Sequence, residues 1–141
     1  MEVPINYWAV LVAAIVAMVL GFLWYGPVFG KKWMELSGLS RESLDAQKQK
    51  GMGLSYTLMT IGALLMSYVL AHSLVFASTY TATFGVAAGL SVGFWSWLGF
   101  VAPVTVGTVL WEGKSWKLWM LNSGYYLVSL LLMGVVLALW Q

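Results

Sequence analysis

One uncharged stretch, residues 83–110, constrains the fold of this chain more than any other feature. It contains no charged side chain, and as a helix with a rise of about 1.5 Å per residue it is long enough to cross roughly 30 Å of hydrocarbon. A helix turns by about 100° per residue, so the small residues of this stretch share one face. A neighbouring helix can approach such a face closely, whereas contact with lipid does not require small residues. The stretch predicts a spanning helix that packs on another helix through Gly85, Gly89, Gly93, Ser96, Gly99, Pro103 and Gly107.

The composition places most of the chain in a membrane. Of its 141 residues 61% are hydrophobic and 9% are charged, whereas soluble domains carry roughly 25% charged residues. Three further uncharged stretches accompany the first, and each is long enough to span a bilayer. We therefore predict an all-α fold, a polytopic four-helix transmembrane bundle forming a single membrane domain over residues 1–141, with spans at about 5–26, 54–76, 83–110 and 118–139.

The cations lie in two segments, 27–53 and 111–117, which contain all seven Lys and Arg residues. These segments fall on the same side of a chain with four spans. Cytoplasmic loops carry an excess of Lys and Arg, so we expect both loops to be cytoplasmic and both termini to lie outside, in a multi-pass protein of the cell membrane.

A second set of small residues occurs in the first predicted span at every fourth position. Small residues in two spans predict that the first and third helices pack on each other. The set consists of Ala9, Ala13, Ala17 and Gly21.

The loop 27–53 begins with Pro27, which stops or bends the first helix. Trp33 and its apolar neighbours are compatible with a segment lying on the lipid headgroups, although a solvated linker explains the same residues. Ser40 precedes Arg41 and two acidic residues, a pattern typical of the N-cap of a short helix.

Several separated motifs resemble a known family. They are Asn6-Tyr7-Trp8-Ala9-Val10, the run from Trp24-Tyr25-Gly26-Pro27 to Trp33, Trp97-Leu98-Gly99-Phe100-Val101-Ala102-Pro103 and Leu121-Asn122-Ser123-Gly124-Tyr125. Together they resemble the domain of unknown function 1761 family of small, mainly bacterial membrane proteins, over essentially the whole chain. The resemblance implies an integral membrane protein and brings no assigned activity and no catalytic or ligand-binding residues.

Few side chains in this chain are candidates for catalysis or metal binding. The spans contain no Asp, Glu, Lys or Arg, the chain has no cysteine, and His72 is the single histidine. An enzyme needs a nucleophile, an acid–base pair or a metal cluster, so we predict no enzymatic activity, no metal and no cofactor. Charges of both signs alternate in the first loop, which argues against a nucleic-acid partner.

The third span also offers a candidate polar pocket. Pro103 cannot donate a hydrogen bond to the carbonyl of Gly99, and unwound backbone at membrane depth has to face protein or a water-filled cavity. The candidate pocket residues are Trp24, Tyr25, Pro27, Trp97, Gly99, Pro103, Thr105 and Asn122. The alternative is that the polar groups among them only bond neighbouring helices and that the tryptophans fill volume.

Two functions follow from these patterns. The first is a non-enzymatic protein of the lipid bilayer that acts through helix packing, as a homo-oligomer or as a subunit beside other membrane proteins. The second is a small transporter or channel for a neutral or apolar solute that uses the break between Gly99 and Pro103. A continuous polar cavity reaching that break would favour the second.

Overall fold

The computed structural model describes residues 2–141 and is built from helices, with no strand in that range. Four spans are long and apolar enough to cross a membrane, which confirms the predicted all-α fold with four spanning helices. The first, third and fourth spans are Tyr7–Val28, Gly85–Leu110 and Trp116–Leu139, and the second is Gly53–Thr81. The elements are α1 (Tyr7–Leu23), η1 (Trp24–Val28), α2 (Gly30–Ser37), α3 (Arg41–Gln49), α4 (Gly53–Thr81), α5 (Gly85–Ser96), η2 (Trp97–Val101), α6 (Ala102–Thr105), α7 (Gly107–Leu110) and α8 (Trp116–Leu139).

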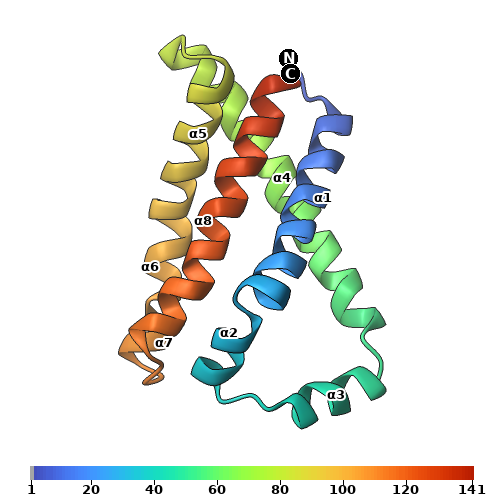
Figure 1. Cartoon of the computed structure of the whole chain (residues 1–141). Coiled ribbons are helices and arrows are strands. Elements are labelled where there is room, and N and C mark those ends of the chain that lie inside the picture. The colour runs from blue at the N-terminus through green and yellow to red at the C-terminus, as the bar shows by residue number, and fades with distance from the viewer. Residues whose placement is uncertain (1) are drawn as a thin grey trace.

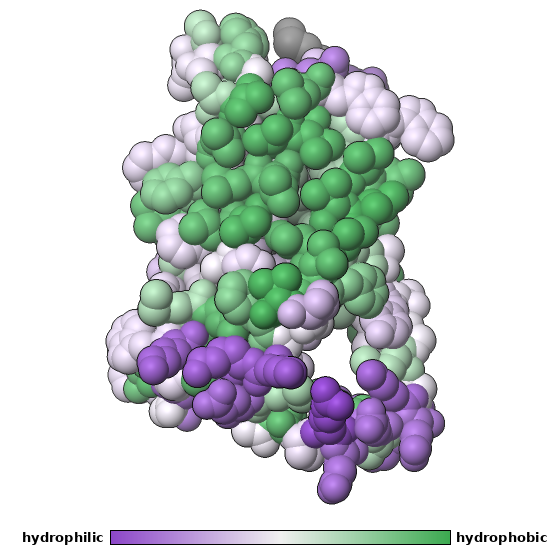
Figure 2. All heavy atoms as spheres, viewed as in Figure 1, coloured by the Kyte–Doolittle hydropathy of each residue, from purple (hydrophilic) through white to green (hydrophobic). Residues whose placement is uncertain are grey.

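Successive spans run in opposite directions, so the connections between them alternate between the two ends of the bundle (Figure 1). Both termini lie at one end, where the Nδ2 group of Asn6 donates a hydrogen bond of 3.1 Å to the carbonyl oxygen of Trp140. The opposite end carries α2, α3 and the turn before α8, and we name it the basic end because all Lys and Arg residues belong to it. Figure 2 shows the hydrophilic surface concentrated there, below a broad apolar belt.

The second span is longer than predicted. The sequence indicated 54–76, whereas α4 continues to Thr81 and ends at Ala82, whose left-handed backbone (φ 52°) turns the chain. In this extra turn the hydroxyl groups donate to carbonyls one turn earlier, as Thr79 does to Val75 and Thr81 does to Ala77, so the polar side chains are satisfied within the helix. Uncharged hydroxyl residues therefore do not mark a helix end here.

The short helix α3 begins where the sequence predicted. The Ser40 hydroxyl accepts from the backbone N–H of Ser43 at 3.1 Å, and the Ser43 hydroxyl lies 3.1 Å from the backbone N–H of Ser40. This reciprocal capping satisfies N–H groups that no intrahelical carbonyl can reach.

The predicted packing of the first helix on the third is wrong. α1 and α5 share no extensive contact; each packs on α8, and α4 crosses against α1 and α5. The reason is a glycine in α8, Gly134, that meets Gly89 of α5 at a close backbone crossing. Because small residues on one helix do not identify the partner helix, the two sets of small residues found in the sequence did not have to meet.

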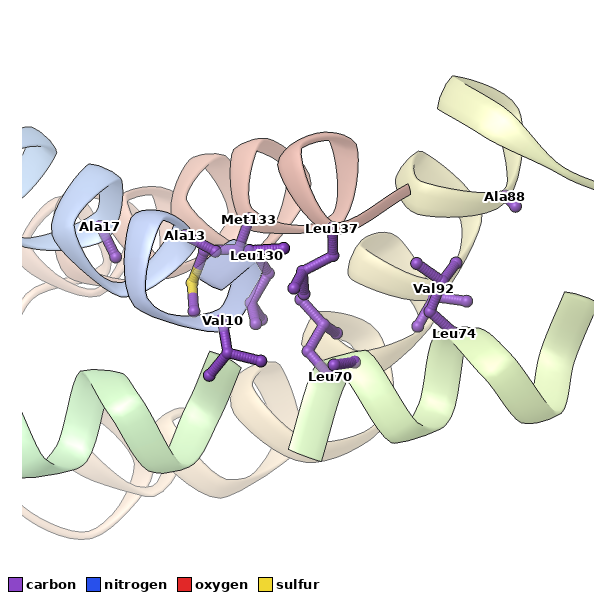
Figure 3. Packing of buried hydrophobic residues seen from close by; sticks show 12 residues of the cluster. Val10, Ala13, Ala17, Leu70, Leu74, Ala88, Val92, Leu130, Met133 and Leu137 are labelled. Atoms are coloured by element: carbon purple, nitrogen blue, oxygen red, sulfur yellow. The ribbon is translucent and has the colours of Figure 1, made fainter. Parts of the chain in front are cut away.

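The apolar core lies in the half of the bundle that carries the termini, and Figure 3 shows how its side chains pack. Buried side chains converge there from α1, α4, α5 and α8, and Ala13 and Met133 are fully enclosed. One buried polar contact joins two spans, since the Ser67 hydroxyl donates 2.8 Å to the carbonyl of Val10. The cluster comprises Ala9, Val10, Ala13, Ala17, Leu70, Ala71, Leu74, Ala88, Val92, Leu130, Met133 and Leu137.

Candidate functional site

The segment of α8 from Trp119 to Tyr125 collects several of the residues that the sequence proposed for a pocket. On its α1 side, the Trp24 indole N–H donates to the carbonyl of Leu121 at 3.1 Å. The Tyr25 hydroxyl donates to Oδ1 of Asn122 at 2.9 Å. Both donors come from η1, so this element is fastened to α8 by two consecutive aromatic side chains.

On its α5 side, the same segment is bound by two other tryptophans. The Trp97 indole N–H lies 2.9 Å from the carbonyl oxygen and 3.1 Å from the hydroxyl of Ser123. The Trp119 indole N–H donates to the hydroxyl of Thr105 at 3.0 Å. Trp97 therefore holds η2, and Thr105 holds α6, against α8.

These contacts do not form a single pocket. Trp119 and Ser123 are four residues apart and share one face of α8, whereas Leu121 and Tyr125 lie on the opposite face. Tyr125 continues the α1 side, where its hydroxyl donates to the carbonyl of Ala17 at 2.9 Å. The geometry is that of polar groups bonding neighbouring helices, the alternative that the sequence left open.

The shape of η1 explains why Trp24 and Tyr25 both reach α8. Gly26 adopts a backbone conformation (φ −107°, ψ −105°) outside the helical range, next to Pro27. The N–H of Phe29 donates to the carbonyl of Trp24 at 2.8 Å, a wide turn of five residues. Wide turns of this type change the direction in which successive side chains point, and here they direct two neighbouring rings to the same helix.

The second break has a different outcome. In η2 the N–H of Ala102 donates to the carbonyl of Trp97, which widens the helix just before Pro103 in the first turn of α6. Gly99 and Pro103 are exposed, and no atom lies within 4 Å of the position that a Cβ of Gly99 would occupy. The structure thus separates these two residues from the contacts on α8.

The predicted packing residues divide into two groups. Gly89 and Gly93 lie against the α8 backbone; a Cβ at Gly93 would be 2.5 Å from the carbonyl oxygen of Leu130. Ala9, Ala13 and Ala17 are buried in the core, and Gly21 faces the ring of Tyr125. Gly85 has open space around it, and the nearest atom to Gly107 belongs to Trp111 on the next turn of its own span.

A cleft of about 640 Å³ lies at the basic end between η1, α2 and α3. Tyr25 and Pro27, both predicted pocket residues, form part of its wall. The other walls come from residues that were not among the predicted pocket residues, including Lys31, Trp33 and Arg41. The signal available in the sequence was the helical spacing of Arg41, Leu44, Asp45 and Lys48, which places them on one face of α3.

Within residues 2–141, no group of three or more His, Cys, Asp or Glu side chains is close enough to hold a metal ion. Nδ1 of His72 lies 2.9 Å from the carbonyl oxygen of Tyr68, one turn earlier in the same helix. This histidine is engaged within α4.

Fold and contacts together define a polytopic α-helical membrane protein whose spans are joined mainly through α8. The family model described as "Protein of unknown function (DUF1761)" matches residues 8–138, and the chain belongs to this family. The resemblance seen in the sequence is thereby confirmed. No curated protein and no solved structure matches the chain.

Proposed function

We propose that this membrane protein is non-enzymatic and acts through helix packing, as a homo-oligomer or as a subunit beside other membrane proteins. The observation that carries the proposal is the exposed break between Gly99 and Pro103 in the third span. The break lies near the middle of the 26-residue span Gly85–Leu110, at the depth of the hydrocarbon.

The surface at this break suits another helix better than it suits lipid. Gly99 leaves a bare patch of backbone, flanked by the exposed side chains of Phe100 (79%) and Val104 (74%). Pro103 has no amide N–H, so a carbonyl of the preceding turn lacks its usual donor. Lipid chains supply no donor, whereas a helix approaching over small residues gains close contacts and can supply polar groups.

The transporter or channel alternative requires a cavity at the same break. A cavity of about 20 Å³ lies beside the termini, and the larger cleft lies at the basic end. Neither is lined by Gly99 or Pro103. This favours a packing surface over a solute pathway at that position.

We further propose that the basic end faces the cytoplasm and that both termini lie outside, in the cell membrane. All seven Lys and Arg residues belong to that end, and the excess of such residues in loops on the cytoplasmic side is the basis of the assignment.

Cross-linking in native membranes tests the packing proposal, and the chain is suited to it because it contains no cysteine. Gly99→Cys places a thiol at the break, and Leu65→Cys serves as control because Leu65 is exposed near the middle of α4. We expect oxidation to join two copies through Gly99→Cys, or a benzophenone attached there to capture another membrane protein, at several times the yield from Leu65→Cys.

Two outcomes would contradict the proposal. Equal yields from the two variants would mean that the break has no dedicated partner. Labelling of Gly99→Cys, but not of Leu65→Cys, by a membrane-impermeant maleimide would indicate water at the break and would favour the transporter or channel.

A further inference from the structure

The cleft at the basic end has a wall of positive charge that no partner in the structure neutralises. Lys31 from α2 and Arg41 and Lys48 from α3 line it, together with a single carboxylate, Asp45. Among residues 2–141 the only ion pair joins Lys32 and Glu35, at 3.6 Å. The cations of the cleft are therefore free to bind an anion.

The rest of the cleft is apolar and aromatic. Val28, Met34 and Leu44 contribute apolar surface, and the rings of Tyr25 and Trp33 meet edge to face with centroids 5.4 Å apart. Tyr25 is the same residue that binds Asn122 of α8, so this wall is anchored to the bundle. A ligand in the cleft would meet both cations and apolar side chains, because α2 and α3 each contribute both kinds of residue.

The position of the cleft fits the boundary between lipid and water. Figure 2 shows an opening through the molecule above the hydrophilic surface of the basic end and below the apolar belt. Aromatic side chains together with Lys and Arg are typical of the headgroup layer. Basic pockets at this level bind the phosphate groups of anionic lipids, and Arg is especially suited to phosphate oxygens.

We propose that this cleft binds a phosphate group through Lys31, Arg41 and Lys48, with the apolar wall accepting the remainder of a phospholipid. Its volume of about 640 Å³ lies within the range of roughly 300–1,000 Å³ typical of small-molecule sites. The same chemistry would recognise free phosphate, and the experiment separates the two sources. The proposal is independent of packing at Gly99.

The test uses the purified full chain and native mass spectrometry to count bound lipids and measure their affinities. Wild-type protein is titrated with phosphatidylglycerol, with phosphatidylcholine, and with phosphatidylglycerol in the presence of inorganic phosphate. We expect phosphatidylglycerol to bind about tenfold more tightly than phosphatidylcholine, because its headgroup carries a net negative charge that Lys and Arg attract. Displacement of the lipid by millimolar phosphate would assign the site to phosphate itself; failure to displace it would assign the site to the lipid.

Matched variants locate the site. The double variant Arg41→Gln with Lys48→Gln is expected to weaken phosphatidylglycerol binding about tenfold. The control, Lys114→Gln with Lys117→Gln, removes two charges from the other loop of the same end and is expected to change binding less than twofold. Equal losses in the two double variants, or equal affinity of the wild-type protein for the two lipids, would overturn the proposal.

A variant that binds more tightly is also informative, because misfolding would weaken binding and could not strengthen it. Asp45→Asn removes the only carboxylate of the cleft, so we expect binding of phosphatidylglycerol to tighten about threefold. Unchanged or weaker binding by this variant, with helix content equal to wild type by circular dichroism, would count against the site.

Discussion

The two halves of the bundle are held together by different interactions. In the half that carries the termini, small residues bring backbones into contact, as Gly89 and Gly134 do between α5 and α8. In the half toward the basic end, aromatic N–H and O–H groups reach across to α8, as those of Trp24 and Trp97 do. The first half is close-packed, whereas the second includes an open cleft and the first turns of α4, residues 53–59, which are exposed throughout.

This difference shows that one chain uses two kinds of interaction to hold its helices together in a membrane. Lipid is as apolar as a leucine side chain, so helices in a bilayer associate through close contact or through hydrogen bonds. Close contact needs small residues and leaves little space between helices. Hydrogen bonds from long aromatic side chains span a larger separation and allow a cleft to form beside them.

The close-packed half is expected to respond most strongly to added volume. Gly89→Ala places a Cβ against the backbone of Gly134, and overpacking of this type typically costs about 1–3 kcal/mol. The free energy of unfolding, measured by titrating dodecyl sulfate into protein in mild detergent, should fall by that amount. Gly62→Ala is the control, because no atom lies within 4 Å of its Cβ position; equal effects would show that the crossing is not tight.

An intermediate effect is expected where the two halves meet. Tyr125→Phe removes the donor to the carbonyl of Ala17, the last core residue of α1. Hydrogen bonds between membrane helices contribute roughly 0.6–1.7 kcal/mol, and the free energy of unfolding should drop by that amount in the same titration. Tyr126→Phe makes the same chemical change at an exposed neighbour; a comparable loss there would mean that the contact with Ala17 contributes nothing.

The smallest expected effect is a coupling energy. Tyr25→Phe and Asn122→Leu disrupt the same hydrogen bond, so a double-mutant cycle should give a coupling of about 0.6 kcal/mol. Tyr25→Phe combined with Ser67→Ala joins changes in different halves, and those effects should add. If the coupling energy of Tyr25→Phe with Ser67→Ala were as large as that of Tyr25→Phe with Asn122→Leu, the two halves would not be energetically independent.

The fold was predictable from the sequence because uncharged length and helical spacing determine where a spanning helix forms. Gly89 and Gly93 were correctly suspected of meeting another helix, yet their partner was not identified. A helix face lined by small residues indicates that another helix packs on it. The sequence of α5 does not say that this partner is α8 or that the contact is at Gly134. Which helices pack on each other depends on the geometry of the loops and on the side chains of all four helices together.

The candidate pocket shows the same limit at the level of single residues. Trp24, Tyr25, Trp97, Thr105 and Asn122 were singled out as polar or aromatic groups at membrane depth, and all of them contact α8 or belong to it. Depth along a helix is readable from the sequence, whereas rotation about the helix axis near a proline is not. The widened turns of η1 and η2 set that rotation, and the cleft beside Tyr25 was missed because it also depends on where α2 and α3 lie after η1.

The central place of α8 has a consequence for biogenesis. Ribosomes deliver α1, α4 and α5 to the bilayer first, yet α1 and α5 both pack on α8. Contacts as distant in the chain as that between Asn6 and Trp140 form only after the fourth helix has been inserted, and such long-range contacts make assembly slow. The face of α5 that carries Gly89 and Gly93 therefore stays uncovered in the insertion machinery or in lipid until α8 arrives and completes the bundle.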